Sequence, residues 1–222
     1  MKFFIYIRYF FFLANKWDIS FAWKSILDDR RGERKYGIDS TGFDDLRHVA
    51  GKGIDISHAT LYMPAPYRLL ENIFNYLQPF SLHHFLDIGA GKGRALCMAP
   101  SFGFQAVEGV EFSKKFCMEA EANLARCNRK KTFDWKIHHN DAYYFDIPAK
   151  ADCILIFNPF DEFLLAGVIQ NIENSLQQNP RRLYIIYITP LYKDLFFESG
   201  YDVIARFIPE EYMEAIVLKK SG

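Results

Sequence analysis

The sequence predicts an α/β protein with a mostly parallel sheet and helices on both of its faces. From residue 66 onward, short apolar runs typical of strands alternate with segments of 3.6-residue apolar periodicity typical of helices. Residues 153–157 and 183–188 are continuous apolar runs, as expected of strands buried on both faces. The chain has 222 residues, half of them hydrophobic, which is enough for one domain with an appendage.

The first 60 residues are the least regular part of the chain. Residues 1–13 are rich in aromatic side chains, but Arg8 interrupts the apolar run and the segment is too short and too charged to span a bilayer. We expect a strand or short helix packed on the core; the alternative is a peripheral contact with a membrane. Residues 19–27 predict a short helix, and the glycines that follow predict loops and turns up to residue 60.

From residue 66 the elements follow in a regular order. Residues 66–77 predict a helix with proline in its first turn. Strands are expected at 84–88, 105–111, 133–139, 153–157 and 183–188, and a final hairpin at 201–207 and 213–218. Helices are expected between them at 93–102, 113–127, 161–178 and 192–198, with Ser113 and Asp161 as N-caps. In such sheets ligands bind at the carboxyl ends of the strands.

A glycine-rich loop follows the first of these strands, with the sequence DIGAGKGR over residues 87–94. Glycines at 89, 91 and 93 allow a tight turn and the close approach of a ligand to the backbone. The pattern of a phosphate-binding P-loop is absent, and Arg94 occupies the place of the third glycine in the dinucleotide pattern G-x-G-x-x-G. Asp87 would repel a pyrophosphate and attract an ammonium or sulfonium group, so the loop favours a cationic ligand.

The second strand ends in another acid, Glu111, 24 residues after Asp87. A carboxylate at this place accepts both hydroxyls of a ribose. Phe112 follows directly and is positioned either to lie on an adenine ring or to pack in the core.

These residues carry a resemblance to a known family. The segments are FLDIGAGKGRAL from residue 85, GVEFS from 109, NDA from 140 and NPF from 158. From about residue 62 to the C-terminus, the chain resembles class I S-adenosylmethionine-dependent methyltransferases. The resemblance implies a Rossmann-like, doubly wound sheet of seven strands, mostly parallel, with an antiparallel strand near the C-terminus. It also implies S-adenosyl-L-methionine as the cofactor and S-adenosyl-L-homocysteine as the product.

The resemblance assigns roles to the cofactor site residue by residue. Asp87 would orient the methionine amino group, and Glu111 would hold the ribose hydroxyls. Asp141 would accept a hydrogen bond from the adenine amino group, and the Ala142 N–H would donate to a ring nitrogen. The remaining cofactor-binding positions are Tyr62, Gly89, Gly91, Gly93, Phe112 and Asn158.

Asn158, Pro159 and Phe160 follow the buried fourth strand. They resemble the N/D-P-P-Y/F motif of methyltransferases that act on planar amino nitrogens. In that motif the Asn oxygen and a proline carbonyl accept hydrogen bonds from the target NH2, and the aromatic ring stacks on the substrate. This chain has one proline where the motif has two, so the motif favours nitrogen as the acceptor and leaves the substrate class open.

Two other functions compete with methyl transfer. A non-catalytic member of the fold, acting in binding or scaffolding, is opposed by the presence of all four polar residues of the implied site: Asp87, Glu111, Asp141 and Asn158. A dinucleotide oxidoreductase is opposed by the glycine spacing and by the lack of any Tyr with Lys four residues later.

Charge and cysteine content limit the partners. The 27 basic and 27 acidic residues balance, which gives no reason to expect strong free-standing binding to nucleic acid, although basic clusters occur at 30–35 and 126–131. The four cysteines form no metal-ligand pattern, so no metal is expected, and they indicate a reducing, cytoplasmic location.

The methyl acceptor remains open between a protein side chain, a nucleobase and a small amine, and the oligomeric state is undetermined. We expect residues 1–60 to pack on a methyltransferase domain of residues 61–222 and to contribute to acceptor recognition.

Overall fold

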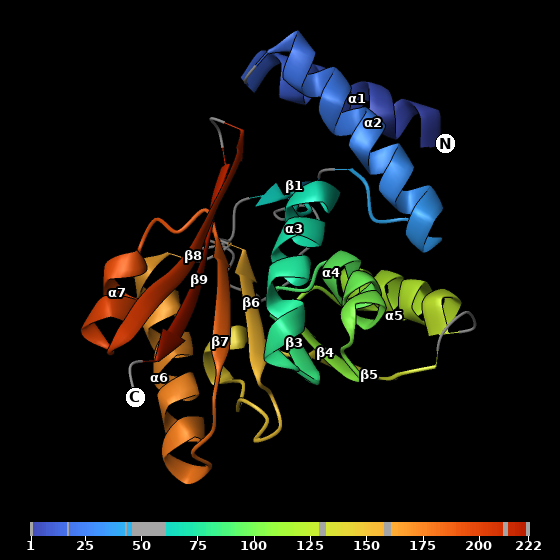
Figure 1. The fold of residues 1–222 in the computed structure, drawn as a ribbon. Helices are drawn as coiled ribbons and strands as arrows, with labels where there is room; N and C mark the ends of the chain where they lie inside the picture. The colour runs from blue at the N-terminus through green and yellow to red at the C-terminus, as the bar shows by residue number, and fades with distance from the viewer. Residues whose placement is uncertain are drawn as a thin grey trace.

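The structure is a computed structural model that describes residues 2–16, 18–42, 44–45, 61–128, 132–157, 161–210 and 213–220. Its centre is a seven-stranded sheet (Figure 1). The strands are β3 (His84–Ile88), β4 (Ala106–Glu111), β5 (Asp134–His139), β6 (Cys153–Phe157), β7 (Tyr184–Ile188), β8 (Tyr201–Glu210) and β9 (Met213–Lys220). A separate two-stranded sheet pairs β1 (Asp44–Asp45) with β2 (Leu61–Tyr62).

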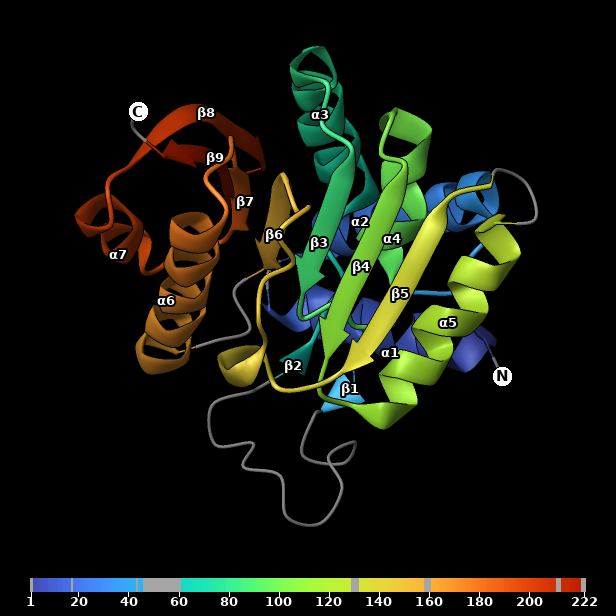
Figure 2. The ribbon, with the colours of Figure 1, turned by 90° about the horizontal axis from the view of Figure 1, so that it is seen from below.

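The strand order of the large sheet is β5-β4-β3-β6-β7-β9-β8. The five strands from β5 to β7 are parallel to their neighbours, and β9 runs antiparallel to both β7 and β8. Strand order reverses between β3 and β6, so a ligand crevice is expected there. Figure 2 shows the arrowheads of β3, β4 and β5 ending at one edge of the sheet, beside β1 and β2. The predicted seven-stranded, mostly parallel fold is confirmed.

Helices cover both faces of the sheet. They are α3 (Tyr67–Leu77), α4 (Arg94–Met98), α5 (Lys114–Asn128), α6 (Glu162–Gln178) and α7 (Lys193–Glu198), with 3₁₀ turns η2 (Gln78–Phe80), η3 (Ala99–Phe102) and η4 (Ala142–Tyr144). Leu70, Leu96 and Leu124, from α3, α4 and α5, share one buried cluster with Phe85. Leu165 and Phe196, from α6 and α7, belong to a second cluster on the opposite face. Two apolar cores therefore sandwich the sheet.

The helix starts follow the predicted caps. The Phe116 N–H donates to Ser113 Oγ at 3.3 Å, and the Leu164 N–H donates to Asp161 Oδ1 at 2.9 Å. The helix expected at 93–102 is divided into α4 and the 3₁₀ turn η3. Pro100, near the start of η3, has no N–H for an α-helical bond, which explains the division.

Two N-terminal helices, α1 (Lys2–Lys16) and α2 (Ile19–Tyr36), lie side by side, and α2 packs against α3 (Figure 1). Asp18 caps α2, since its Oδ1 accepts a hydrogen bond from the Phe21 N–H at 2.8 Å. Of the two forms expected for the first residues, the structure has the helix. Within the described ranges, no helix is both long and apolar enough to cross a membrane.

The sequence-based expectation of a short helix at 19–27 followed by loops is wrong, because α2 continues to Tyr36. Gly32 is a helix breaker by propensity, but in this helix it is a packing position: a Cβ there would lie 2.1 Å from Cγ of Tyr67. The helix ends instead at Gly37, which has a left-handed φ of 73° and donates its N–H to the Glu33 carbonyl oxygen.

Candidate functional site

Two buried carboxylates end neighbouring strands. Asp87 in β3 pairs with Gly109 of β4, and Glu111 is the last residue of β4. Each is only 5% exposed. Burial, together with the charge of Glu111, raises the pKa of Asp87 to about 8, and burial likewise raises the pKa of Glu111. A buried carboxyl group whose ionisation is opposed by burial and by a neighbouring carboxylate favours a cation beside it.

Glu111 also holds the glycine loop. Its two oxygens each accept a backbone N–H at 2.8 Å, from Gly91 and from Ser113. A carboxylate has about four lone-pair sites, so about two remain for a ligand's hydroxyls. The acid that the resemblance assigns to a ribose therefore also fixes the glycine loop.

The loop and the strand behind it both need glycine, each for its own reason. Gly89, Gly91 and Gly93 have φ values of 87°, 53° and 77°, in the left-handed region that favours glycine. Behind the loop, a Cβ on Gly109 would lie 2.6 Å from Cδ1 of Leu96 and 2.8 Å from Cβ of Ala90. β4 therefore packs closely against Ala90 of the loop and Leu96 of α4.

The end of β5 lies beside the end of β4, because the Asn140 N–H donates to the Glu111 carbonyl oxygen at 3.1 Å. Asp141 follows; it is exposed, and its Oδ1 accepts the Tyr143 N–H at 2.9 Å. This bond starts the turn η4, in which Ala142 is the first residue. Phe112 is half-buried at the end of β4. The structure thus brings the predicted residues of β3, β4 and β5 to one edge of the sheet.

The structure does not describe the side chains of the other predicted site residues. Asn158, Pro159 and Phe160 lie outside the described residues, directly after β6. The backbone of Tyr62 pairs with Asp44 in the small sheet, but its side chain is not described. Their assigned roles stay predictions.

Sequence reasoning missed the environment of Arg94, at the start of α4. This side chain is 4% exposed, its Nη1 lies 2.7 Å from Asp29 Oδ1 of α2, and its guanidinium lies 4.0 Å from the Tyr67 ring centre. It also donates to Ser40 Oγ and to the Ala65 carbonyl oxygen, both at 2.9 Å. Burial raises the pKa of Asp29 to about 6, and Arg94 opposes this rise.

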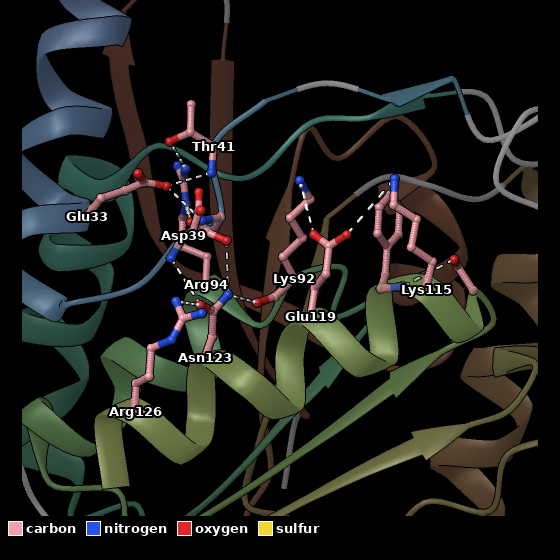
Figure 3. A network of polar contacts seen from close by, with 12 residues as sticks. Glu33, Asp39, Thr41, Lys92, Arg94, Lys115, Glu119, Asn123 and Arg126 are labelled. Carbon is pink, nitrogen blue, oxygen red and sulfur yellow. Dashed lines mark hydrogen bonds and ion pairs between the residues drawn. The ribbon is translucent and has the colours of Figure 1, made fainter. Parts of the chain in front are cut away.

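Neighbouring contacts extend this network (Figure 3). Glu33 Oε1 accepts the N–H groups of Ser40 and Thr41, each at 2.7 Å. Asn123 of α5 donates to the carbonyl oxygens of Asp39 and Lys92. The N-terminal segment is thereby tied to the glycine loop and to the helices behind it. In the sequence, the only indication of this network was the unusual position of Arg94 in the glycine motif. No sequence pattern indicated that Arg94 pairs with Asp29.

No family model matches the sequence, and no curated protein matches it. Solved structures do match the fold. A candidate methylase from Haemophilus influenzae is 19% identical with a TM-score of 0.55, covering 70% of this chain and 98% of its own. The magnesium protoporphyrin IX methyltransferase of Synechocystis, solved with bound S-adenosylmethionine, is 14% identical with a TM-score of 0.55, covering 69% and 79%.

The chain has the fold of class I S-adenosylmethionine-dependent methyltransferases. Another protein of this fold, the Bacillus subtilis TrmK, is a tRNA methyltransferase; it is 14% identical with a TM-score of 0.52, covering 69% of this chain and 66% of its own. Proteins of this methyltransferase fold thus act on substrates as different as a porphyrin and a tRNA. The fold does not by itself identify the methyl acceptor.

Proposed function

We propose that this protein is an S-adenosylmethionine-dependent methyltransferase whose acceptor atom is a nitrogen. The observation that carries the proposal is the buried pair Asp87 and Glu111 beside the glycine loop, at the switch point of a methyltransferase fold. A dinucleotide or other phosphorylated ligand would be repelled by this pair, whereas a ligand with an ammonium and a sulfonium group is attracted.

When bound, S-adenosylmethionine supplies a methyl group on a sulfonium, which is already an activated leaving group. Asp87 binds and orients the methionine amino group, and Glu111 accepts the ribose hydroxyls with the lone pairs that the loop leaves unused. Asp141 and the Ala142 N–H recognise the adenine edge. Phe112 and Tyr62 contribute apolar walls to the same pocket.

Asn158, Pro159 and Phe160 would hold the acceptor. The Asn158 side-chain oxygen and the Pro159 carbonyl accept hydrogen bonds from an amino group, and the Phe160 ring packs on its plane. Aligning the nucleophile with the methyl group and the sulfur is the main contribution of the protein, worth several kcal/mol and up to about 7–11 kcal/mol in the best cases. A protein side chain, a nucleobase and a small amine all present such a nitrogen.

The direct test is calorimetric titration of the purified protein with S-adenosylhomocysteine. We expect low-micromolar binding, and at least about tenfold weaker binding for Asp87→Asn, because a charge-assisted bond is lost. Asp134→Asn, an exposed acid at the opposite end of β5, is the matched control and should bind like the parent. No heat of binding at millimolar ligand would refute the proposal.

The acceptor is identified by transferring tritiated methyl groups from S-adenosylmethionine into a cell extract and separating protein, RNA and small molecules. Label in one fraction, lost with Asn158→Ala, would define the acceptor class. Tight cofactor binding without transfer to any fraction would instead indicate the non-catalytic alternative.

A further inference from the structure

The N-terminal helices carry an apolar surface on the side away from the protein. Ile19, Trp23 and Leu27 of α2 are 64%, 56% and 60% exposed, and Phe11 of α1 is 66% exposed. The three α2 residues are spaced by four and so form one stripe. The Phe10 ring joins the helices, with its centre 5.0 Å from that of Trp23 and 5.6 Å from that of Phe11. Exposed apolar patches of this kind mark interaction sites.

The acids of α2 are turned toward the protein and its basic residues are exposed, although Arg31 and Lys35 also pair with Glu71 of α3 at 3.7 and 2.7 Å. All five basic residues of the helix are exposed: Lys24, Arg30, Arg31, Arg34 and Lys35. The three acids are turned toward the protein and are bound there. Asp28 contacts Arg68 of α3 at 3.0 Å, Asp29 contacts Arg94, and Glu33 accepts backbone N–H groups. The outer side of α2 is therefore cationic, although the helix sequence mixes both signs.

A groove joins the apolar and cationic parts. Its volume is about 310 Å³, and it is lined by Leu27, Arg30, Arg31 and Arg34. The groove is lined mostly by the apolar parts of these side chains, which provide a wall for an acyl chain. The exposed Arg30 and Arg34 beside it offer donors for a phosphate group, whereas Arg31 also lies 3.7 Å from Glu71. We refer to these four residues with Phe11, Ile19, Trp23 and Lys24 as the hairpin face.

We infer that the hairpin face binds the surface of an anionic membrane. Helices that lie in a membrane interface combine Trp, Phe and Leu with Lys and Arg, as the hairpin face does. The aromatic and aliphatic side chains enter the headgroup region, and the arginines contact lipid phosphates. This inference does not depend on the proposed methyl transfer.

Two other occupants fit the surface less well. A second copy docking through the same face would set the four basic residues of one hairpin face against the same four of the other, while Asp28 and Asp29 of each copy stay bound to that copy's own arginines. A nucleic acid would satisfy the arginines but would leave Ile19 and Leu27 against a polar backbone. An anionic lipid surface accommodates both the apolar and the cationic residues of the hairpin face.

Co-sedimentation of the full chain with vesicles tests the inference. Vesicles of phosphatidylcholine with about 30% phosphatidylglycerol should carry the protein down, and vesicles of phosphatidylcholine alone should carry much less. Each basic residue near an anionic surface contributes about fivefold in partitioning. Arg30→Glu with Arg34→Glu should therefore lower partitioning by at least about 25-fold, and Trp23→Ser with Leu27→Ser by at least about tenfold.

Matched controls change the same chemistry elsewhere on the surface. Lys136→Glu with Arg182→Glu carries the same change in net charge, and Met118→Ser with Ile208→Ser replaces two equally exposed apolar side chains. Both controls should bind vesicles like the parent. Circular dichroism melting confirms that each variant is folded.

Several outcomes would overturn the inference. They are equal binding to neutral and anionic vesicles, equal losses in the hairpin variants and their controls, and no sedimentation with either vesicle. If the parent ignores vesicles but binds a random RNA of about 20 nucleotides through the same arginines, the face recognises nucleic acid instead. If it ignores vesicles but self-associates in a way that Trp23→Ser abolishes, the face is a contact between copies.

Discussion

The carboxyl group of Asp87 is held where its charge is disfavoured. It is buried at the end of β3, and Glu111 adds a second negative charge nearby, which together raise its pKa to about 8. An ordinary Asp ionises near pH 4. Placing this buried carboxyl group beside a second one lowers the free energy of unfolding of the ligand-free protein. The same two groups favour the binding of a cation, because its positive charge offsets theirs.

The pH dependence of stability tests this arrangement. Between pH about 4 and 8 the folded protein keeps a proton on Asp87 that the unfolded chain has lost, so this group lowers the free energy of unfolding as pH rises. Asp87→Asn removes that loss. Relative to the parent, we expect the variant to gain roughly 1–3 kcal/mol between pH 5 and pH 8 in urea denaturation. Parallel pH curves would contradict the pKa, and Asp134→Asn serves as the exposed control.

At the scale of elements, the packing of α2 on α3 depends on the contact between Gly32 and the Tyr67 ring. Gly32 faces the ring of Tyr67, which is 1% exposed, stacked on Tyr36 at 5.8 Å, and covered by the Arg94 guanidinium. The ring is held on both faces and cannot move aside. The contact fixes how closely α2 approaches α3.

Replacing Gly32 tests that contact. Ala is the better helix former by about 1 kcal/mol, so an open position would gain stability from Gly32→Ala. Here we expect a net loss of about 1–3 kcal/mol in the free energy of unfolding, because the new Cβ meets the Tyr67 ring. Gly167→Ala in α6 is the comparison, since it faces the half-buried Tyr143 and should cost less. A higher free energy of unfolding for Gly32→Ala would show that α2 and α3 are not in contact at this position.

At the scale of the whole molecule, the candidate site draws on segments far apart in the chain. β3 and β4 supply the acids, Glu111 holds the glycine loop, and Asp29 of α2 holds Arg94 behind the loop (Figure 3). Ligand binding to such a site stabilises the entire fold by mass action.

Thermal unfolding measures that linkage. S-adenosylhomocysteine at 100 times its dissociation constant contributes about 2.7 kcal/mol, which corresponds to a rise in Tm of roughly 5–10 °C for a chain of this size. For Asp87→Asn, whose binding is expected to be at least about tenfold weaker, the same ligand concentration contributes no more than about 1.4 kcal/mol, so its Tm should rise by about half as much as that of the parent, or less. A shift of equal size in both proteins, or a shift with NAD in place of S-adenosylhomocysteine, would contradict the assignment of the site.

Much of the fold could be predicted because its signals are local. The apolar run at residues 153–157 and the caps Ser113 and Asp161 each depend on residues within a few positions. Asp87 and Glu111 could also be singled out, since strand ends in an alternating α/β chain meet at one edge. The length of α2 could not be predicted, because Gly32 is a breaker by propensity and a packing position only in the presence of Tyr67.

The sequence by itself determined the order of strands and helices, the glycine loop and the acids that flank it. Only the tertiary structure decided which charged side chains of the N-terminal helices are buried and which are exposed. The 27 basic and 27 acidic residues cancel in the sequence, yet folding turns Asp29 and Glu33 inward and leaves Arg30 and Arg34 outside. The physical reason is that a net charge sums over the chain, whereas a partner meets only the charges that remain at the surface.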